Sequence, residues 1–302
     1  MKNKFKLTTP ILFLIFNRLE TTKRVFEEIR KAKPTKLFIA ADGPRNEKEK
    51  RVTDRVRKWV LSNINWHCKV KTLFREKNLG CKYAVSSAIG WFFENVHQGI
   101  ILEDDCLPSQ SFFRFCQELL EKYKKNKKIK MITGYNLLDN NINLNYSYWF
   151  SSNMFIWGWA TWRRAWEEYD INIEKKVDII KLYKLSNNFF DFLLNLKRVN
   201  DLKNKKVDTW DYQWSISMKL RKGLCIVPKR NLIENLGFCE QFTNTKPNEI
   251  DIKYFYKKRK DLDFPLIHPP KIENNKSLDK RILLLNLKRI FLKKVRRLSF
   301  SS

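Results

Sequence analysis

Short apolar runs alternate with amphipathic segments through the first 132 residues, and this alternation constrains the fold more than any other feature of the sequence. The apolar runs have the length of buried parallel strands and lie at 10–16, 36–41, 70–74, 99–102 and 129–132. The segments between them have apolar residues at helical spacing and lie at about 21–33, 47–61, 83–96 and 112–123. This order predicts right-handed βαβ units and an α/β fold built on a parallel sheet.

Local signals refine two of these helices. Thr21 and Thr22 are typical capping residues, so we expect one of them to begin the first helix, and Pro34 to follow its end. In the second helix the spacing of the apolar residues predicts an inward face, formed by Val52, Val56, Trp59 and Val60.

Polar residues follow three of the predicted strands at the points where the strands end. They are Asn17-Arg18, Asp42-Gly43 and Glu103-Asp104-Asp105. In an open parallel sheet, ligands bind outside the carboxyl ends of the strands. We therefore expect these three segments to converge on a binding site.

The acidic triplet has two interpretations. Three adjacent carboxylates repel one another unless a cation compensates them, and their oxygens suit Mg²⁺ or Mn²⁺, which would in turn bridge a diphosphate. An acidic turn in solvent is the simpler interpretation. The apolar run Gly99–Leu102 directly before the triplet favours the metal site, because a solvated turn does not need a buried strand before it.

The net charge of +29 on 302 residues points to acidic partners such as nucleic acid, anionic lipid or phosphorylated substrates. A lysine-rich surface without a single partner explains the same charge. Nine Lys and Arg stand against Asp279 alone after residue 275, and the remaining charge is spread out, which weakens a nucleic-acid patch. Hydrophobic residues make up 43% of the chain, enough for a substantial core.

Six cysteines and three histidines show neither zinc-ligand spacing nor a dense disulfide pattern, so reduced thiols in the cytoplasm are expected. The apolar run at 11–16 is too short for a secretory signal, and no segment is long and apolar enough to cross a membrane.

The quoted motifs resemble a known family. The run from Gly99 to Phe113, with Glu-Asp-Asp after a strand and Phe-Phe at a helix start, resembles the DXD-type region of the N-acetylglucosaminyltransferase I family and its bacterial surface-polysaccharide relatives. The resemblance covers about residues 8–245. Its other motifs lie at 10–18, 38–45, 74–93, 157–159 and 210–211.

The resemblance implies a GT-A fold, which is Rossmann-like and typical of nucleotide-diphospho-sugar transferases. Residues 1–140 would form the nucleotide-sugar-binding half, 141–275 the acceptor-binding half of the same domain, and 276–302 a basic amphipathic tail. The implied donor is a UDP-sugar, with UDP-N-acetylglucosamine as the family precedent. The implied acceptor is a hydroxyl of a glycan or lipid-linked glycan in cell-surface polysaccharide synthesis.

The same resemblance assigns roles to the polar residues. Asp105 would be the direct ligand of the Mn²⁺ or Mg²⁺, and Glu103 and Asp104 would support the ribose and phosphates. Asp42 would face the uracil and Arg18 would lie near the nucleotide. The loop before the third helix would approach the donor through Asn78, Gly80 and Lys82.

Asp211 stands at the family's position for the catalytic base, beside Trp210. It would take the proton of the acceptor hydroxyl as that oxygen attacks the anomeric carbon, so the anomeric centre inverts. Without the resemblance, a surface carboxylate in a charged loop is the preferred interpretation of Asp211.

Two further segments belong to the resemblance. Trp157, Trp159 and Trp162 are candidates to line the acceptor or sugar pocket, although such clusters are commonly core, and the helical spacing of Trp162 and Trp166 favours core for that pair. The segment 235–237 resembles a loop near the nucleotide, but Cys239 and Asn244 depart from the family pattern after it.

The tail has apolar residues at helical spacing with Lys and Arg between them, which is typical of a helix at an anionic membrane surface. A helix packed on the body of the protein is the alternative. With the membrane interpretation, the expected location is the cytoplasm, peripherally on the inner face of the membrane.

Two other functions compete with the glycosyltransferase. A sugar-1-phosphate nucleotidyltransferase shares the nucleotide-binding strands and the metal, but the sequence has no glycine-rich phosphate loop near its start and carries the basic tail. A nucleic-acid-binding protein would use Lys and interleaved aromatics, but no known module supports it, and no nucleic-acid partner is expected.

Overall fold

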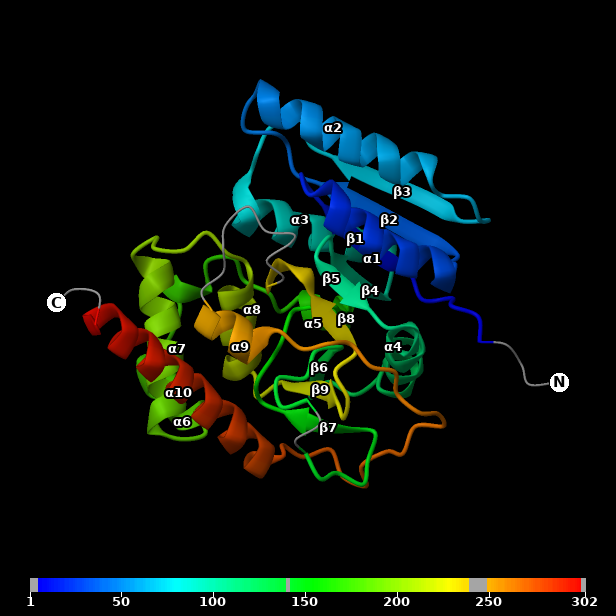
Figure 1. Cartoon of the computed structure of the whole chain (residues 1–302). Helices are drawn as coiled ribbons and strands as arrows, with labels where there is room; N and C mark the ends of the chain where they lie inside the picture. Colours follow the sequence, from blue (N-terminus) through cyan, green and yellow to red (C-terminus); the bar gives the residue numbers. More distant parts are fainter. Residues whose placement is uncertain (1–4, 140–141, 239–248, 300–302) are drawn as a thin grey trace.

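The computed structural model describes residues 5–139, 142–238 and 249–299. Within these ranges, eight strands form one sheet in the order β3-β2-β1-β4-β8-β6-β9-β7 (Figure 1). The strands are β1 (Ile11–Ile15), β2 (Lys36–Ala41), β3 (Lys69–Phe74), β4 (Gln98–Glu103), β6 (Ile129–Thr133), β7 (Tyr148–Ser151), β8 (Trp159–Trp162) and β9 (Leu224–Pro228). A second, two-stranded sheet pairs β5 (Cys106–Pro108) with β10 (Ile233–Asn235).

The main sheet is largely parallel. β1 pairs in parallel with β2 and β4, and β2 pairs in parallel with β3. β8 is antiparallel to both of its neighbours, and β7 is antiparallel to β9. The order 3-2-1-4 of the first four strands is that of a Rossmann-like nucleotide-binding half. The predicted α/β architecture with a Rossmann-like sheet is therefore confirmed.

Helices cover both faces of the sheet. The longer ones are α1 (Leu19–Ala32), α2 (Glu47–Ser62), α3 (Gly80–Asn95), α4 (Gln110–Lys122), α7 (Phe189–Lys203), α8 (Asp211–Leu220) and α10 (Lys276–Ser299). The shorter ones are α5 (Arg163–Trp166), α6 (Ile179–Leu185), α9 (Glu249–Phe255) and the 3-10 turns η1 (Ile173–Lys175) and η2 (Leu236–Phe238).

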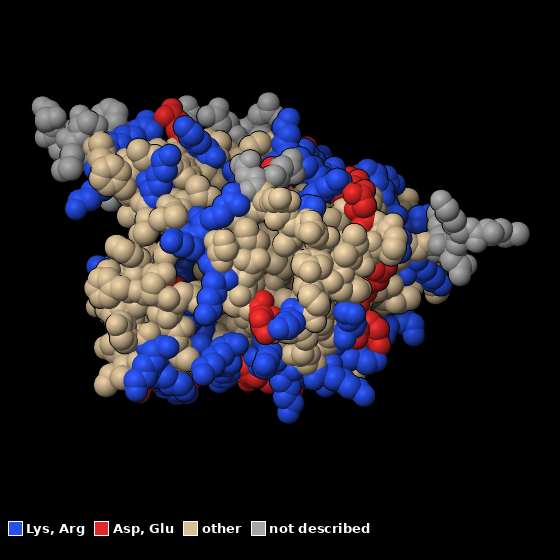
Figure 2. Space-filling view, turned by 90° about the horizontal axis from the view of Figure 1, so that it is seen from below, with Lys and Arg blue, Asp and Glu red and all other residues tan. Residues whose placement is uncertain are grey.

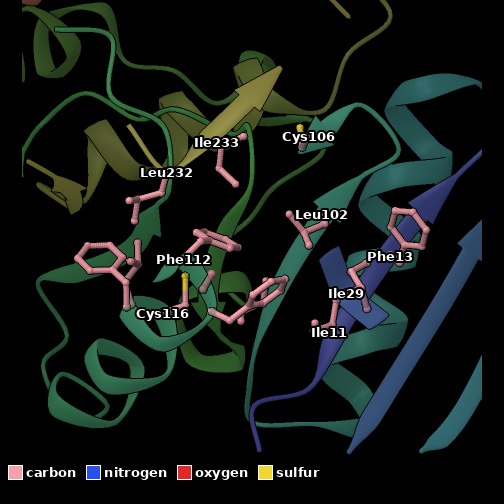
Figure 3. Packing of buried hydrophobic residues seen from close by; sticks show 14 of the residues in the cluster. Ile11, Phe13, Ile29, Leu102, Cys106, Phe112, Cys116, Leu232 and Ile233 are labelled. Carbon is pink, nitrogen blue, oxygen red and sulfur yellow. The ribbon is translucent and has the colours of Figure 1, made fainter. Parts of the chain in front are cut away.

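β1 shows why the core has two parts. Its side chains alternate between the faces of the sheet, as in any strand. Ile11, Phe13 and Ile15 pack with α1, α2 and α4, whereas Leu12 and Leu14 pack with α3 on the other face. Figure 3 shows the first of these clusters, in which Leu102 of β4 lies between Phe13 and Phe112.

The helix details differ from two of the expectations. The cap of α1 is Arg18, and Thr22 lies inside the helix, where its hydroxyl donates back to the Arg18 carbonyl at 2.6 Å. Val56 and Val60 of α2 are buried as predicted, but Val52 is 39% exposed, because only a narrow face of α2 contacts the sheet. Asn46 caps α2 by accepting from the Glu49 amide.

Most of the tryptophan cluster is core. Trp159 is fully buried and stacks on Trp210 with 5.6 Å between the ring centroids, and Trp162 and Trp166 are also buried. Of the two interpretations that the sequence left open, core therefore holds for Trp159 and Trp162, because both lie on β8 in the middle of the sheet. Trp157, directly before that strand, is only partly buried.

The basic tail forms α10 and packs on the body of the protein. Leu278 and Ile282 are buried, and Asp279 accepts hydrogen bonds from Ser151 and Ser152. Further along, Arg289 pairs with Asp251 of α9 at 2.8 Å. Exposed apolar side chains remain on the helix, at Leu284, Ile290, Phe291 and Val295. In the part of the chain that the structure describes, no helix is long and apolar enough to cross a bilayer.

Candidate active site

The acidic triplet lies where the topology of the sheet predicts a ligand. β1 and β4 are parallel neighbours with Leu14 opposite Glu103, so their carboxyl ends lie side by side. β1 is also the strand from which the chain runs outward to β2 on one side and β4 on the other, which makes this edge the switch point of the sheet. Arg18 follows the end of β1, and Asp104 and Asp105 follow the end of β4.

Arg18 binds two of the three carboxylates. Its Nη1 donates to Asp105 Oδ2 at 2.9 Å, and its Nη2 donates to Asp104 Oδ1. Burial alone would lower the pKa of the guanidinium, but the charges of Asp104 and Asp105 outweigh it and raise the pKa above its usual value. Arg18 therefore supplies one positive charge to a cluster that contains three carboxyl groups.

Two carboxyl oxygens of the cluster have no hydrogen-bond partner among the described residues. They are Glu103 Oε1 and Asp104 Oδ2, and both are inaccessible to solvent. Burial, followed by the charges of Asp105 and Asp104, raises the pKa of Glu103 to about 8. Burial raises the pKa of Asp104 to about 6, against the opposing charge of Arg18. The cluster has a larger demand for positive charge or protons than Arg18 satisfies.

These residues fit a hard divalent cation held jointly with a ligand. The described residues contain no group of three His, Cys, Asp or Glu side chains that could enclose a metal. Mg²⁺, however, is commonly held by one or two carboxylates together with substrate phosphates and water. The two unpartnered oxygens and the partly exposed Asp105 meet that requirement. Asp105 and Asp104 are the residues that would hold the metal.

The opposite wall of the site is also acidic, but its carboxylates accept hydrogen bonds from backbone amides. Asp42 accepts from the amides of Gly43, Leu79 and Gly80, at 2.8, 2.9 and 3.1 Å. Asp208 accepts from the amides of Cys81 and Lys82, at 2.9 and 3.1 Å. Carboxylates at a helix N-terminus accept hydrogen bonds from its free amides, and their negative charge interacts favourably with the positive end of the helix dipole. These two side chains therefore fix the start of α3.

The turn before α3 requires a glycine. Gly80 has φ of 76°, and a Cβ there would lie 2.6 Å from Asp208 Oδ2. Asn78 ties the same turn to the end of β2, because its side-chain amide donates to the Gly43 carbonyl at 2.7 Å. The resemblance predicted Asn78 and Gly80 for this loop, but Asp208 was missed. Its only signal in the sequence was its place three residues before Asp211.

The two walls enclose a pocket of about 470 Å³, a size that suits a small ligand. Its floor is apolar and comes from the ends of β1 and β2 and from α3, with Leu14, Ala40, Ala84 and Ala88. Six of the eight predicted binding and metal residues line it: Arg18, Asp42, Asn78, Gly80, Glu103 and Asp104. Arg45, Arg75 and Cys81 also line it, and the sequence had not singled them out.

The two other predicted residues lie outside this lining. Lys82 has its ammonium 5.6 Å from the ring centroid of Tyr83 on α3. Asp105 lies beside the segment that the resemblance predicted near the nucleotide. The Leu236 amide donates to the Asp105 carbonyl at 2.8 Å, and a Cβ on Gly237 would lie 2.9 Å from Asp105 Oδ2. Cys239 and Asn244, where the sequence departs from the family, lie outside the described residues.

Asp211 lies in a second cleft of about 420 Å³. It is the first residue of α8, and the Thr209 hydroxyl donates to it. Trp157 and Tyr212 line the same cleft. The charge of Asp211 is one of the causes that raise the pKa of Glu103, so the carboxylate acts electrostatically on the acidic cluster. Asp211 thus belongs to one cleft and lies within electrostatic reach of the other.

No protein-family model matches the chain, and no curated protein matches it in sequence. It is similar to a solved UDP-glucose pyrophosphorylase complexed with UDP-glucose, with 12% identity, 78% of this chain and 96% of that chain covered, and a TM-score of 0.42. It is similar to S. aureus TarS 1-349 with 7% identity, 75% of this chain and 59% of that chain covered, and a TM-score of 0.40. Its similarity to HddC from Yersinia pseudotuberculosis has 9% identity, 54% of this chain and 80% of that chain covered, and a TM-score of 0.33. Likenesses of this extent do not assign an activity.

Proposed function

We propose that the protein is a metal-dependent, inverting glycosyltransferase that uses a nucleotide-diphosphate sugar, with a UDP-sugar as the expected donor. One observation carries the proposal: a nucleotide-sized pocket at the switch point of the sheet ends in a carboxylate cluster, and a second cleft beside it contains a carboxylate that acts on that cluster. A transfer reaction needs a donor site and an acceptor site that share the reacting atoms.

In this proposal the pocket holds the nucleotide. The apolar floor would contact the base and ribose, and Arg18 would move from Asp104 and Asp105 toward the diphosphate. The divalent cation, when bound, supplies positive charge that stabilises the leaving diphosphate. Asp42 and Asp208 fix the start of α3, so the wall opposite the acidic cluster is in place before the donor binds.

Asp211 acts on the acceptor. Its carboxylate takes the proton of an acceptor hydroxyl while the oxygen of that hydroxyl forms a bond to the anomeric carbon. The bond from the anomeric carbon to the diphosphate oxygen breaks, and the diphosphate leaves with the electron pair. Because the new bond forms opposite the breaking one, an α-linked donor gives a β-glycoside. Trp157 offers an apolar ring face to the acceptor sugar in the same cleft.

The test is hydrolysis of a panel of nucleotide-sugars, with Mn²⁺ or Mg²⁺ present or chelated, by the unchanged protein and by Asp105→Ala. We expect slow, metal-dependent release of the nucleotide diphosphate from one donor, and its loss in Asp105→Ala. Formation of a nucleotide-sugar from a sugar-1-phosphate and a nucleoside triphosphate, with release of pyrophosphate, would favour the nucleotidyltransferase instead. Absence of both reactions and of nucleotide binding would overturn the proposal.

We also propose that α10 brings the enzyme to an anionic membrane surface on the cytoplasmic side. The outer face of this helix combines the exposed Phe291 and Val295 with the exposed Lys288 and Lys294. Each basic residue near such a surface contributes about 1 kcal/mol of binding free energy. Lys288→Glu/Lys294→Glu should lose binding to phosphatidylglycerol vesicles, while Lys48→Glu/Lys58→Glu on α2 should retain it. Equal binding by both variants would contradict this assignment.

A further inference from the structure

A groove runs between α10 and the pair α6–α7, and the function proposed above does not use it. Its volume is about 980 Å³, roughly twice that of the nucleotide pocket. Leu185, Phe190 and Leu194 line it from one side, and Leu283, Leu284 and Leu287 line it from α10. Figure 2 shows this side of the molecule, where a recess separates two tan surfaces on the left. The walls of the groove suit a hydrocarbon chain.

The groove is also strongly basic. Lys184, Lys276 and Lys280 line it and are exposed, and none of them has an ion pair within the described residues. The two carboxylates of the lining are engaged elsewhere. Asp191 pairs with the buried Lys219 at 2.8 Å, and Asp279 accepts from Ser151 and Ser152. Basic side chains border the recess in Figure 2. An apolar floor with uncompensated cations matches an amphiphile with an anionic head.

The groove borders the cleft that contains Asp211. Leu194, Arg198 and Asn286 line both spaces. Arg198 is held there by hydrogen bonds from its Nη1 to Asn195 and Ser215, at 3.0 and 3.3 Å. A guanidinium recognises phosphate well, because its fork of N–H groups matches two phosphate oxygens. The junction between groove and cleft is thus suited to a phosphate group.

Large apolar side chains are exposed on the two helices that form one side of the groove. Ile180 of α6 is 68% exposed, and Phe189 and Phe190 of α7 are each more than half exposed. Phe190 also lines the groove. Exposed apolar side chains on these helices suit contact with a lipid layer.

We propose that this groove binds the lipid-phosphate part of the acceptor. The hydrocarbon would lie between α10 and α6–α7, the phosphate would lie near Arg198, and the sugar attached to it would reach Asp211. The inference rests on the proposed function, because it gives the Asp211 cleft an acceptor class: a sugar linked through phosphate to a lipid.

The test uses dodecyl phosphate, below the concentration at which it forms micelles, as a soluble probe of this chemistry. Its binding is measured by isothermal titration, with dodecanol and inorganic pyrophosphate as probes of the tail and the head alone. Lys184→Gln/Lys276→Gln/Lys280→Gln removes charge from the groove, and Lys48→Gln/Lys50→Gln/Lys58→Gln removes the same charge from exposed positions of α2. Leu284→Glu places a carboxylate in the groove. Its control, Val52→Glu, places a carboxylate at an exposed apolar position of α2, outside the groove.

We expect both groove variants to bind dodecyl phosphate at least about tenfold more weakly. The lysine variant loses three cations that would attract the phosphate, and Leu284→Glu places a carboxylate that repels the phosphate among the apolar side chains. Both α2 variants should bind like the unchanged protein, and dodecanol and pyrophosphate should bind more weakly than dodecyl phosphate. Equal weakening in the groove and α2 variants would overturn the proposal. So would binding to phosphatidylglycerol vesicles with none to monomeric dodecyl phosphate, because that pattern describes a membrane surface alone.

Nucleotide-sugar binding by the unchanged protein is measured separately, which distinguishes this inference from the proposed function. Nucleotide-sugar binding without dodecyl phosphate binding would overturn the proposal that the groove binds the acceptor lipid, and the proposed glycosyltransferase function would stand. Dodecyl phosphate binding without any nucleotide-sugar binding would overturn the role of the groove in acceptor recognition.

Discussion

The two acidic walls of the pocket at the switch point of the sheet contain the same residue types in opposite situations. On the wall formed by Asp42 and Asp208, the carboxylates accept backbone amides and hold the start of α3. On the wall formed by Glu103 and Asp104, with Asp105 beside it, one arginine pairs with two of the three carboxylates. Two buried oxygens there have no partner among the described residues. Carboxylates whose bonds are all made within the protein maintain its structure, whereas those with unmet demand are available to a ligand.

Asp211 extends this comparison and gives the largest expected effect. Within the described structure its side chain accepts only from Thr209, so it belongs with the carboxylates that remain available. Asp211→Asn keeps the shape and removes the base, so the transfer rate should fall about 10²- to 10⁴-fold, the usual contribution of a general base. Nucleotide binding should not change. Transfer rates and nucleotide affinity are measured on the same preparation.

The matched control for Asp211 is Asp201→Asn. Asp201 lines the same cleft but is paired with Lys197. A comparable loss of rate in Asp201→Asn would show that any charge in the cleft has this effect, and would end the assignment of Asp211 as the base.

The next largest effect is expected at Arg18. Arg18→Gln leaves a buried cluster of carboxylates without its cation, which should lower the free energy of unfolding by about 3 kcal/mol in a chelator. Added Mg²⁺ or Mn²⁺ should recover more stability in this variant than in the unchanged protein, because the metal replaces the missing charge. Urea denaturation with and without the metal measures both quantities.

Arg45→Gln is the control for Arg18. Arg45 pairs with Glu49 at an exposed position, so its loss should cost much less stability than the loss of Arg18 and should not depend on the metal. Equal effects at both arginines would mean that the cluster has no special demand for a cation.

A smaller effect is expected at the wall that maintains the structure. Gly80→Ala forces a side chain onto a backbone with positive φ and toward Asp208, so it should lower the free energy of unfolding by about 1–3 kcal/mol. Gly90→Ala in the same helix meets nothing within 4 Å and should raise stability by about 0.5–1 kcal/mol. Thermal unfolding of the two variants gives the comparison, and a stable Gly80→Ala would contradict the described turn.

The last effect is expected at Glu103, where the change of stability with pH is the observable. Its pKa is raised from 4.5 to about 8, so the folded protein holds the proton more tightly than the unfolded chain. As the pH rises through this window the unfolded chain ionises first, and the folded state loses stability. Glu103→Gln removes this loss, so in a chelator its stability relative to the unchanged protein should rise from about pH 5 to about pH 8.

The exposed Glu76→Gln is the control for Glu103, and its stability relative to the unchanged protein should stay constant across that range. A flat difference for Glu103→Gln as well would mean that the carboxyl group is less buried than the structure describes.

Several elements were predictable because their signals are local. The strand at 99–102 and the acids after it needed only an apolar run and a polar end, and the convergence of residues 18, 42 and 103 followed from parallel pairing. Local signals misplaced the start of α1, since Thr21 and Thr22 are good caps but Arg18 is where the strand ends and the helix begins. They also left Trp159 ambiguous, because an aromatic residue suits both a sheet core and a sugar pocket.

The sequence by itself determined the alternation of strands and helices through residue 132, the acidic end of β4 and the basic, amphipathic character of the tail, because each depends on residues close together in the chain. Only the tertiary structure decided which charges meet. It paired Arg18 with Asp104 and Asp105, brought Asp208 to a helix that begins at Gly80, and laid α10 beside α6 and α7 to form the groove. The physical reason is that charge compensation and cavity shape arise between elements far apart in sequence. A local sequence pattern does not encode which of these elements come together in space.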